Sequence, residues 1–121
     1  MVQFIKNKVT NKVEMVLEER ELKEDEVLLK ANTSDGALEK HVPVVKVEKD
    51  SVHVEVGEVT HPMSEEHHIA FIALITDKKS ILKELDHTSA PKADFTLAEG
   101  EKVIAAYEYC NLHGLWVKNV D

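Results

Sequence analysis

The sequence contains a single cysteine, Cys110, among its 121 residues. One thiol cannot form an intramolecular disulfide, and it cannot supply the four thiolates of a structural zinc or iron site. Apolar runs are also short, and none reaches the length that a membrane-spanning helix needs. The first ten residues, MVQFIKNKVT, lack the apolar core and the cleavage site of a secretory signal. We therefore expect a cytoplasmic protein that does not associate with membranes.

Positive charge is scarce as well. The chain has 15 Lys and Arg residues against 23 Asp and Glu residues, which gives a formal net charge of −8. Such a surface repels phosphate backbones, and no run of basic residues offsets it, so we expect no binding to nucleic acid. The same field disfavours a free anionic substrate unless a cationic side chain stands close to the site that binds it.

A series of short apolar segments fills much of the chain. Val52, Val54 and Val56 alternate with polar residues, which is the period of a strand with one buried face. Residues 69–76 are almost wholly apolar, as in a strand buried on both faces. Further short strands are expected around residues 42–45, 81–85, 94–97, 103–109 and 114–118. Seven or so such strands, separated by turn signals, predict an all-β protein built as an antiparallel β-sandwich.

The first 38 residues differ in character. Val2 and Phe4 alternate, and residues 13–17 suit the second strand of a hairpin, although a helix over residues 11–30 fits the same apolar spacing. The charge-dense segment 18–26 is typical of a solvated loop. Residues 32–36, Asn-Thr-Ser-Asp-Gly, form a turn signal. We place a boundary there, between a small amino-terminal β segment without a metal site, residues 1–36, and a main domain, residues 37–121.

Seven histidines are a high number for a chain of this length. Cys110 and His113 are three residues apart, so a thiolate and an imidazole can reach one metal ion from a tight loop. His41, His61 and His67 lie near the edges of expected strands, where side chains can converge on one surface. Each of these three, taken singly, also suits a structural histidine that is hydrogen-bonded near a strand end.

The remaining histidines are weaker candidates for a metal site. His67 and His68 are adjacent, and successive strand residues point to opposite faces, so one of the two at most is expected to face a shared site. His53 lies on the polar face of an alternating strand, and His87 lies in a loop. We expect neither of these two to bind a metal ion.

Four motifs occur together in the order and spacing of one protein family. They are EKHVPV at residues 39–44, VGEVTHPM at 56–63, EH at 66–67 and YCNLHGLW at 109–116. Through these motifs the region of roughly residues 30–118 resembles the superoxide reductases, also called the desulfoferrodoxin and neelaredoxin family. The resemblance implies an immunoglobulin-like β-sandwich, which agrees with the strand pattern.

The resemblance also implies one mononuclear non-haem iron per chain, which cycles between Fe2+ and Fe3+. Its ligands would be four equatorial imidazoles and one axial thiolate, from His41, His61, His67, His113 and Cys110. Glu39 would take the sixth position in the oxidised state, and Lys40 would attract the superoxide anion. A thiolate ligand donates electron density through the metal to whatever binds opposite, which favours electron transfer to superoxide.

The activity implied is that of an oxidoreductase, the one-electron reduction of superoxide to hydrogen peroxide without production of O2. Rubredoxin or a similar small carrier would supply the electrons, and the protein would be a homo-oligomer, a dimer or a tetramer, in an anaerobe or microaerophile. Other interpretations stay open. They are a non-catalytic metal-binding or metal-sensing module, a dismutase, and an immunoglobulin-like interaction domain with structural histidines.

The sequence departs from the family pattern at three places. His68 stands where tyrosine is frequent and Phe71 where tryptophan is frequent, and neither position is a ligand in the family. No cysteine precedes Cys110, whereas two-iron members carry a rubredoxin-like four-cysteine centre in their amino-terminal region. The pattern is that of a one-iron form that keeps an amino-terminal segment without its metal. We expect apolar packing alone to stabilise that segment.

Overall fold

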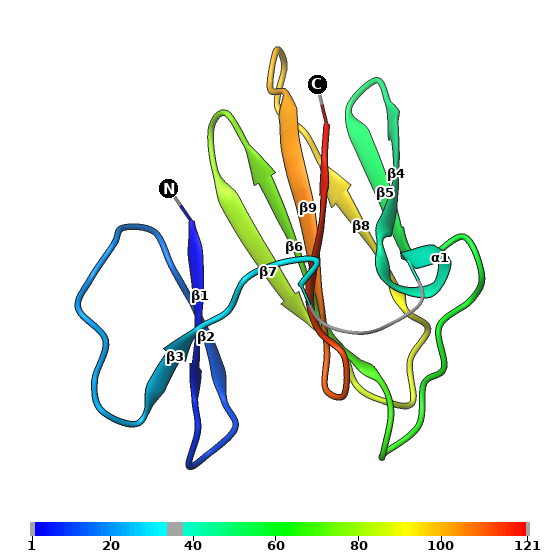
Figure 1. The fold of residues 1–121 in the computed structure, drawn as a ribbon. Helices are drawn as coiled ribbons and strands as arrows, with labels where there is room; N and C mark the ends of the chain where they lie inside the picture. The colour runs from blue at the N-terminus through cyan, green and yellow to red at the C-terminus, as the bar shows by residue number, and fades with distance from the viewer. Residues whose placement is uncertain (1, 34–37, 121) are drawn as a thin grey trace. The chain divides into compact units, whose positions relative to one another are not determined.

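The computed structural model describes residues 2–33 and 38–120, and within them it shows ten β-strands and one helical turn (Figure 1). The side chains of Leu38 and Glu39 lie outside this description. The chain divides into two compact units, Met1–Ala31 and Asn32–Asp121. Within the described ranges, no helix has both the length and the apolar character needed to cross a membrane.

The first unit is a three-stranded antiparallel sheet in the order β2-β1-β3. Its strands are β1 (Gln3–Asn7), β2 (Val13–Val16) and β3 (Glu26–Leu28). The side-chain oxygen of Asn7 closes the β1–β2 turn, because it accepts hydrogen bonds from the backbone N–H groups of Val9 and Thr10, both at 2.9 Å. The expected hairpin is therefore present, and the alternative helix over residues 11–30 is wrong, because β2 pairs residue by residue with β1.

The charge-dense segment of the first unit has a structural role that its composition does not reveal. Arg20 forms ion pairs with Glu14 on β2, at 2.9 Å, and with Glu26 on β3, at 2.8 Å. Hydrogen bonds from Arg20 lower the pKa of Glu26 to about 2. Asn7 also donates a side-chain hydrogen bond to Asp25, at 3.1 Å. One planar guanidinium therefore joins the two strands that flank β1, and the expectation that apolar packing alone stabilises this unit stays a prediction.

The second unit consists of two antiparallel sheets. One sheet has the order β4-β5-β8, with β4 at Pro43–Glu48, β5 at Ser51–Val56 and β8 at Lys92–Thr96. The other has the order β10-β9-β6-β7, with β6 at Ile69–Thr76, β7 at Ser80–Glu84, β9 at Val103–Cys110 and β10 at Gly114–Asn119. A four-residue helical turn, α1 (Leu38–His41), precedes β4. The predicted immunoglobulin-like antiparallel β-sandwich is confirmed.

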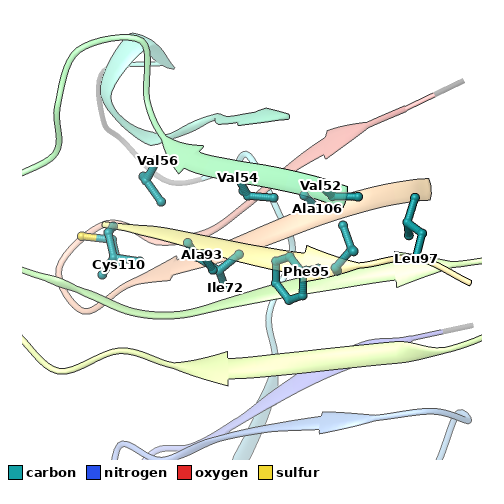
Figure 2. Packing of buried hydrophobic residues seen from close by; sticks show 11 residues of the cluster. Val52, Val54, Val56, Ile72, Ala93, Phe95, Leu97, Ala106 and Cys110 are labelled. Carbon is teal, nitrogen blue, oxygen red and sulfur yellow. The ribbon is translucent and has the colours of Figure 1, made fainter. Parts of the chain in front are cut away.

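Apolar side chains from both sheets form the core between them (Figure 2). Val52, Val54 and Val56 on β5 are at most 1% exposed, and the residues between them on the strand are not buried. β6 lies inside its sheet, and six of its eight residues are buried, as the apolar run predicts. Figure 2 shows Val56 and Cys110 at one end of this core and Leu97 at the other.

Three connections leave the sandwich at the end where Cys110 lies. Pro43 at the start of β4 pairs with Val56 at the end of β5, and Ile69 at the start of β6 pairs with Cys110 at the end of β9. α1, the long β5–β6 connection and the short β9–β10 turn therefore extend from these strand ends. The paired strand ends are rigid, so side chains on connections that begin there can be held close to one point.

Candidate metal centre

Four imidazoles and one thiol converge at this end of the sandwich. Each offers one donor atom, and the five donor atoms all lie within 4.8 Å of one another. The residues are the five that the sequence analysis associates with a metal: His41, His61, His67, Cys110 and His113. His41, His61 and Cys110 are buried, whereas His67 and His113 are partly exposed. A shell of this kind leaves one side of the centre closer to solvent.

The five candidate ligands lie at the end of α1, in the β5–β6 connection and at or near the ends of β6, β9 and β10. His41 ends α1, Cys110 is the last residue of β9, and His113 directly precedes β10. His67 precedes β6, and the neighbouring His68 is not part of the group, as the alternation of side chains predicts. His61 lies inside the β5–β6 connection, so the expectation that it stands at a strand edge is wrong. The connection is long enough to fold this side chain back to the sandwich.

The four imidazole rings form a closed square. Successive ring centroids are 4.8 Å apart for His41 and His61, 4.7 Å for His61 and His67, 5.0 Å for His67 and His113, and 4.7 Å for His113 and His41. Neighbouring ring planes meet at 72° to 80°. The arrangement therefore resembles four blades around a common point.

The donor atoms have the spacing that a metal ion requires. His41 Nε2 lies 3.0 Å from His113 Nδ1 and 3.2 Å from His61 Nε2, and the Cys110 sulfur lies 3.8 Å from His113 Nδ1. Two nitrogens bound at right angles to one metal at ~2.1 Å would be about 3.0 Å apart. His67 Nε2 is buried and has no hydrogen-bond partner among the described residues. A buried nitrogen without a partner is costly in a metal-free protein and useful as a ligand, so the residues fit a metal ion.

The electrostatics of the site favour neutral imidazoles. Burial, and to a smaller extent the charges of the neighbouring histidines, lower the pKa of His61 to about 4, although the hydrogen bond to Pro62 acts in the opposite direction. Burial also lowers the pKa of His67, with contributions from His113, His41 and Lys40. A neutral imidazole offers the lone pair that a metal ion needs, so these ligands require no deprotonation at neutral pH.

The thiol of Cys110 behaves in the opposite way. Burial raises its pKa, although hydrogen bonds from the backbone N–H groups of Leu112 and His113 lower it, and Glu108 raises it further. A metal ion that binds to this sulfur must therefore displace a proton, and it supplies the positive charge that stabilises the thiolate. The two N–H groups then remain as donors to the sulfur.

Contacts behind the ligands orient the rings. His61 donates its Nδ1–H to the carbonyl oxygen of Pro62 at 2.7 Å, which leaves its Nε2 lone pair facing the centre. Trp116 stacks on His41, with ring centroids 5.0 Å apart and planes at 21°, and donates its indole N–H to the carbonyl oxygen of His113 at 3.0 Å. Trp116 therefore touches two ligand residues, a role that no feature of the sequence indicates.

The other predicted site residues lie on α1. Lys40 is exposed there, and its positive charge is near enough to lower the pKa of His67. Glu39 belongs to the same helical turn, but its side chain lies outside the described part of the chain. Sequence analysis did not single out Glu108, which is fully buried on β9 with no hydrogen-bond partner among the described residues. Burial raises the pKa of this carboxyl well above its ordinary value.

Known proteins share both the sequence pattern and the fold. The family model described as desulfoferrodoxin matches residues 33–119. The desulfoferrodoxin of Nitratidesulfovibrio vulgaris is 49% identical over 89 residues, which cover 74% of this chain and 69% of that protein. The superoxide reductase of Thermococcus kodakarensis is 37% identical over 105 residues, covering 73% of this chain and 91% of that protein. The crystal structure of the superoxide reductase from Treponema pallidum has 36% identity and a TM-score of 0.83, covering 98% of this chain and 99% of that chain.

An immunoglobulin-like sandwich with four imidazoles and one thiol converging at one end defines a class of metal-binding β-proteins. The length of the family match and the identity to its members specify the class further. The chain belongs to the desulfoferrodoxin family.

Proposed function

We propose that this protein is a superoxide reductase with one mononuclear non-haem iron per chain. Four imidazoles and one thiolate would hold the iron, from His41, His61, His67, His113 and Cys110. The observation that carries the proposal is the convergence of these five donor atoms within 4.8 Å in a member of the desulfoferrodoxin family. Superoxide reductases among the relatives and the solved structures support it.

The reaction takes up one electron and two protons for each superoxide anion and releases one hydrogen peroxide. When bound, the iron supplies the electron and alternates between Fe2+ and Fe3+. The protein holds four imidazoles around the centre, burial favours the neutral form of His61 and His67, and Cys110 would contribute a thiolate whose electron donation favours transfer to superoxide rather than the reverse. The buried sulfur end of the centre excludes water, so small ions approach from the side of the partly exposed His67 and His113.

Lys40 and Glu39 have separate roles in this proposal. Lys40 attracts the superoxide anion against the overall charge of −8, because at physiological salt a charge acts over a Debye length of about 8 Å and a near cation outweighs a distant negative surface. The exposure of Lys40 and its effect on the pKa of His67 support this role. Glu39 would supply a carboxylate ligand to the oxidised iron.

The partners follow from the electron balance. Each turnover consumes one electron, so we propose rubredoxin or a similar small electron carrier as the donor. By resemblance to the family, we propose a homo-oligomer, a dimer or a tetramer, as the active form. We also propose a cytoplasmic location, because a site that depends on a free thiolate and on a supply of electrons suits a reducing compartment.

Metal analysis combined with visible spectroscopy tests the proposal. We expect one iron per chain and a sulfur-to-iron charge-transfer band that appears on oxidation by superoxide, with formation of hydrogen peroxide and without release of O2. The band should be lost in Cys110→Ser, which keeps the shape of the side chain but replaces its sulfur. A protein that binds zinc or no metal, and that develops no such band after anaerobic reconstitution with iron, would overturn the proposal.

A metal-binding or metal-sensing module is the alternative that this experiment separates. Imidazole ligands also suit zinc, copper and nickel, so the histidines by themselves do not select iron. Stoichiometric binding of a redox-inert metal, without oxidation by superoxide, would favour that alternative.

A further inference from the structure

The β9–β10 turn and the segment that carries His67 are joined by one side chain. Asn111 donates a hydrogen bond from Nδ2 to the carbonyl oxygen of Glu66, at 2.9 Å, and accepts one at Oδ1 from the backbone N–H of His68, at 2.9 Å. Its own backbone N–H donates to the carbonyl oxygen of His68, at 3.2 Å. Three hydrogen bonds from one residue therefore bracket His67 on both sides.

His67 needs such support because its segment belongs to neither sheet. Its backbone contacts within the segment are local: the His67 N–H donates to Ser64 Oγ at 3.2 Å, and the His67 carbonyl oxygen accepts from the Ser64 N–H at 2.9 Å. These bonds shape a tight turn without attaching it to the rest of the centre. The β6–β9 ladder begins at Ile69 and Cys110 and is irregular between Ile69 and Phe71.

We propose that Asn111 is a positioning residue of the metal centre, which sets the place of the His67 imidazole relative to the Cys110 sulfur. It does so by holding the peptide groups on both sides of His67 to the turn that carries Cys110 and His113. This inference rests on the proposed metal centre, but it requires neither the superoxide reaction nor the electron donor.

The chemistry of the side chain explains why an amide suits this place. A primary amide offers a donor and an acceptor at the same time, and the two peptide groups of Glu66 and His68 require one of each. A carboxylate would be unable to donate to the Glu66 carbonyl oxygen, so Asn111→Asp keeps one bond and loses the other. Asn111→Ala loses both side-chain bonds and leaves the two peptide groups to find water instead.

The affinity for ferrous iron measures the positioning role. Loss of a residue that orients metal ligands typically weakens metal binding about 10–100-fold, and we expect Asn111→Ala to fall in this range. Asn111→Asp should lie between Asn111→Ala and the wild type. The charge-transfer band of the oxidised protein should shift in both variants, because the His67 ring no longer has one fixed place. Val59→Ala is the control, because the Val59 side chain is 50% exposed and contacts none of the ligands described above.

A double-mutant cycle separates positioning from a general effect on the turn. If Asn111 acts through His67, then adding Asn111→Ala to His67→Ala should cause no further loss of iron affinity. Equal losses with and without His67 would contradict the proposal, because Asn111 would then act on Cys110, on His113 or on folding. Where Asn111→Ala does not fold, the same cycle made with Asn111→Asp gives the answer.

The two proposals fail in different ways. A wild-type protein that binds no iron contradicts the proposed function. A wild-type protein that binds iron, with Asn111→Ala and Val59→Ala both equal to it in affinity and in the charge-transfer band, contradicts the positioning role alone.

Discussion

The two units of this chain differ in the interactions that join their strands. In the first unit an exposed arginine connects the strands on either side of β1, and a side-chain amide closes the β1–β2 turn. In the second unit two sheets enclose an apolar core, and buried polar side chains occur at the metal centre and in the hydrogen-bonded pair Thr76 and Glu101. The comparison teaches that a polar group can be tolerated at a sheet surface, whereas inside a core it is costly unless it is hydrogen-bonded, paired or bound to a metal.

The largest effect on the comparison of the two units is expected from a cavity created in the apolar core of the second unit. Ile72 on β6 is fully buried, and we expect Ile72→Ala to lower the free energy of unfolding of the second unit by about 2–5 kcal/mol. Ile104→Ala on β9 is the control, because Ile104 is 47% exposed and should change stability by less than about 0.5 kcal/mol. Denaturant titration followed by the fluorescence of Trp116, the sole tryptophan, measures both. Equal losses of unfolding free energy in the two variants would show that burial does not govern stability in this sheet.

A change at the edge of the metal centre should affect the reaction and leave the core intact. We expect Lys40→Ala to reduce the second-order rate with superoxide roughly 10-fold at low salt and to flatten its dependence on ionic strength, because the local attraction is lost. Lys40→Arg should retain most of the rate. Pulse radiolysis at several salt concentrations measures this effect. Identical salt dependence in wild type and Lys40→Ala would remove Lys40 from the mechanism.

The reverse experiment addresses the first unit. Arg20→Ala should speed hydrogen exchange of the amides in β1, β2 and β3, because the link between Glu14 and Glu26 is lost, and should leave the exchange of β4–β10 unchanged. Arg20→Lys keeps the charge without the planar fork and should give a partial effect. Hydrogen exchange followed by mass spectrometry reports both units in one sample. Unchanged exchange in the first unit would show that the ion pairs contribute nothing there.

The smallest effect is expected from His53, a polar group at a sheet surface of the second unit. Its Nδ1 lies 2.6 Å from Asp94 and its Nε2 lies 2.7 Å from Glu55, so both ring nitrogens donate only in the imidazolium form. Hydrogen bonds to Glu55 and Asp94 raise the pKa of His53 above its ordinary value of 6.5. The same contacts lower the pKa of both carboxyls, and the neighbouring lysines lower it further: Lys46, Lys83 and Lys92.

The sign of the pH effect follows from these shifts. Because folding raises the pKa of His53, its stabilising contribution is complete below pH 6.5 and is lost as the pH rises through the higher pKa of the folded protein. At the acid end the contribution is lost again as the two carboxyls become protonated. The difference in unfolding free energy between wild type and His53→Gln should therefore shrink toward alkaline pH. A difference that grows with pH would contradict this assignment.

Local patterns predicted much of the sandwich. The alternating valines of β5 and the apolar run of β6 each depend on neighbours a few residues away, so they could be recognised without a fold. The hairpin and the helix could not be separated in the first unit, because its apolar spacing fits both. The link from Arg20 to Glu14 and Glu26 was missed, because it depends on two strands lying on either side of a third.

At the metal centre, too, some features could be predicted from the sequence and others could not. The motifs around His41, His61, His67 and the Cys110–His113 turn are short and specific enough to indicate metal ligands from sequence. Alternation along a strand predicted that at most one of His67 and His68 faces the site, and the family resemblance then singled out His67. Trp116 and Asn111 stand inside a recognised motif, but their hydrogen bonds reach His113, Glu66 and His68, and those partners became visible with the fold.

By itself, the sequence determined the residue types of the ligands, the family and the class of fold, because these are carried by local periodicity and by motifs of a few residues. The tertiary structure decided how the ligands meet and what holds them. Four imidazoles and a sulfur come within 4.8 Å because three connections leave neighbouring strand ends. Trp116 contacts both His41 and His113, and Asn111 joins the β9–β10 turn to the segment of His67. Contacts between residues far apart in the chain exist only once the strands have paired, so no local pattern contains them.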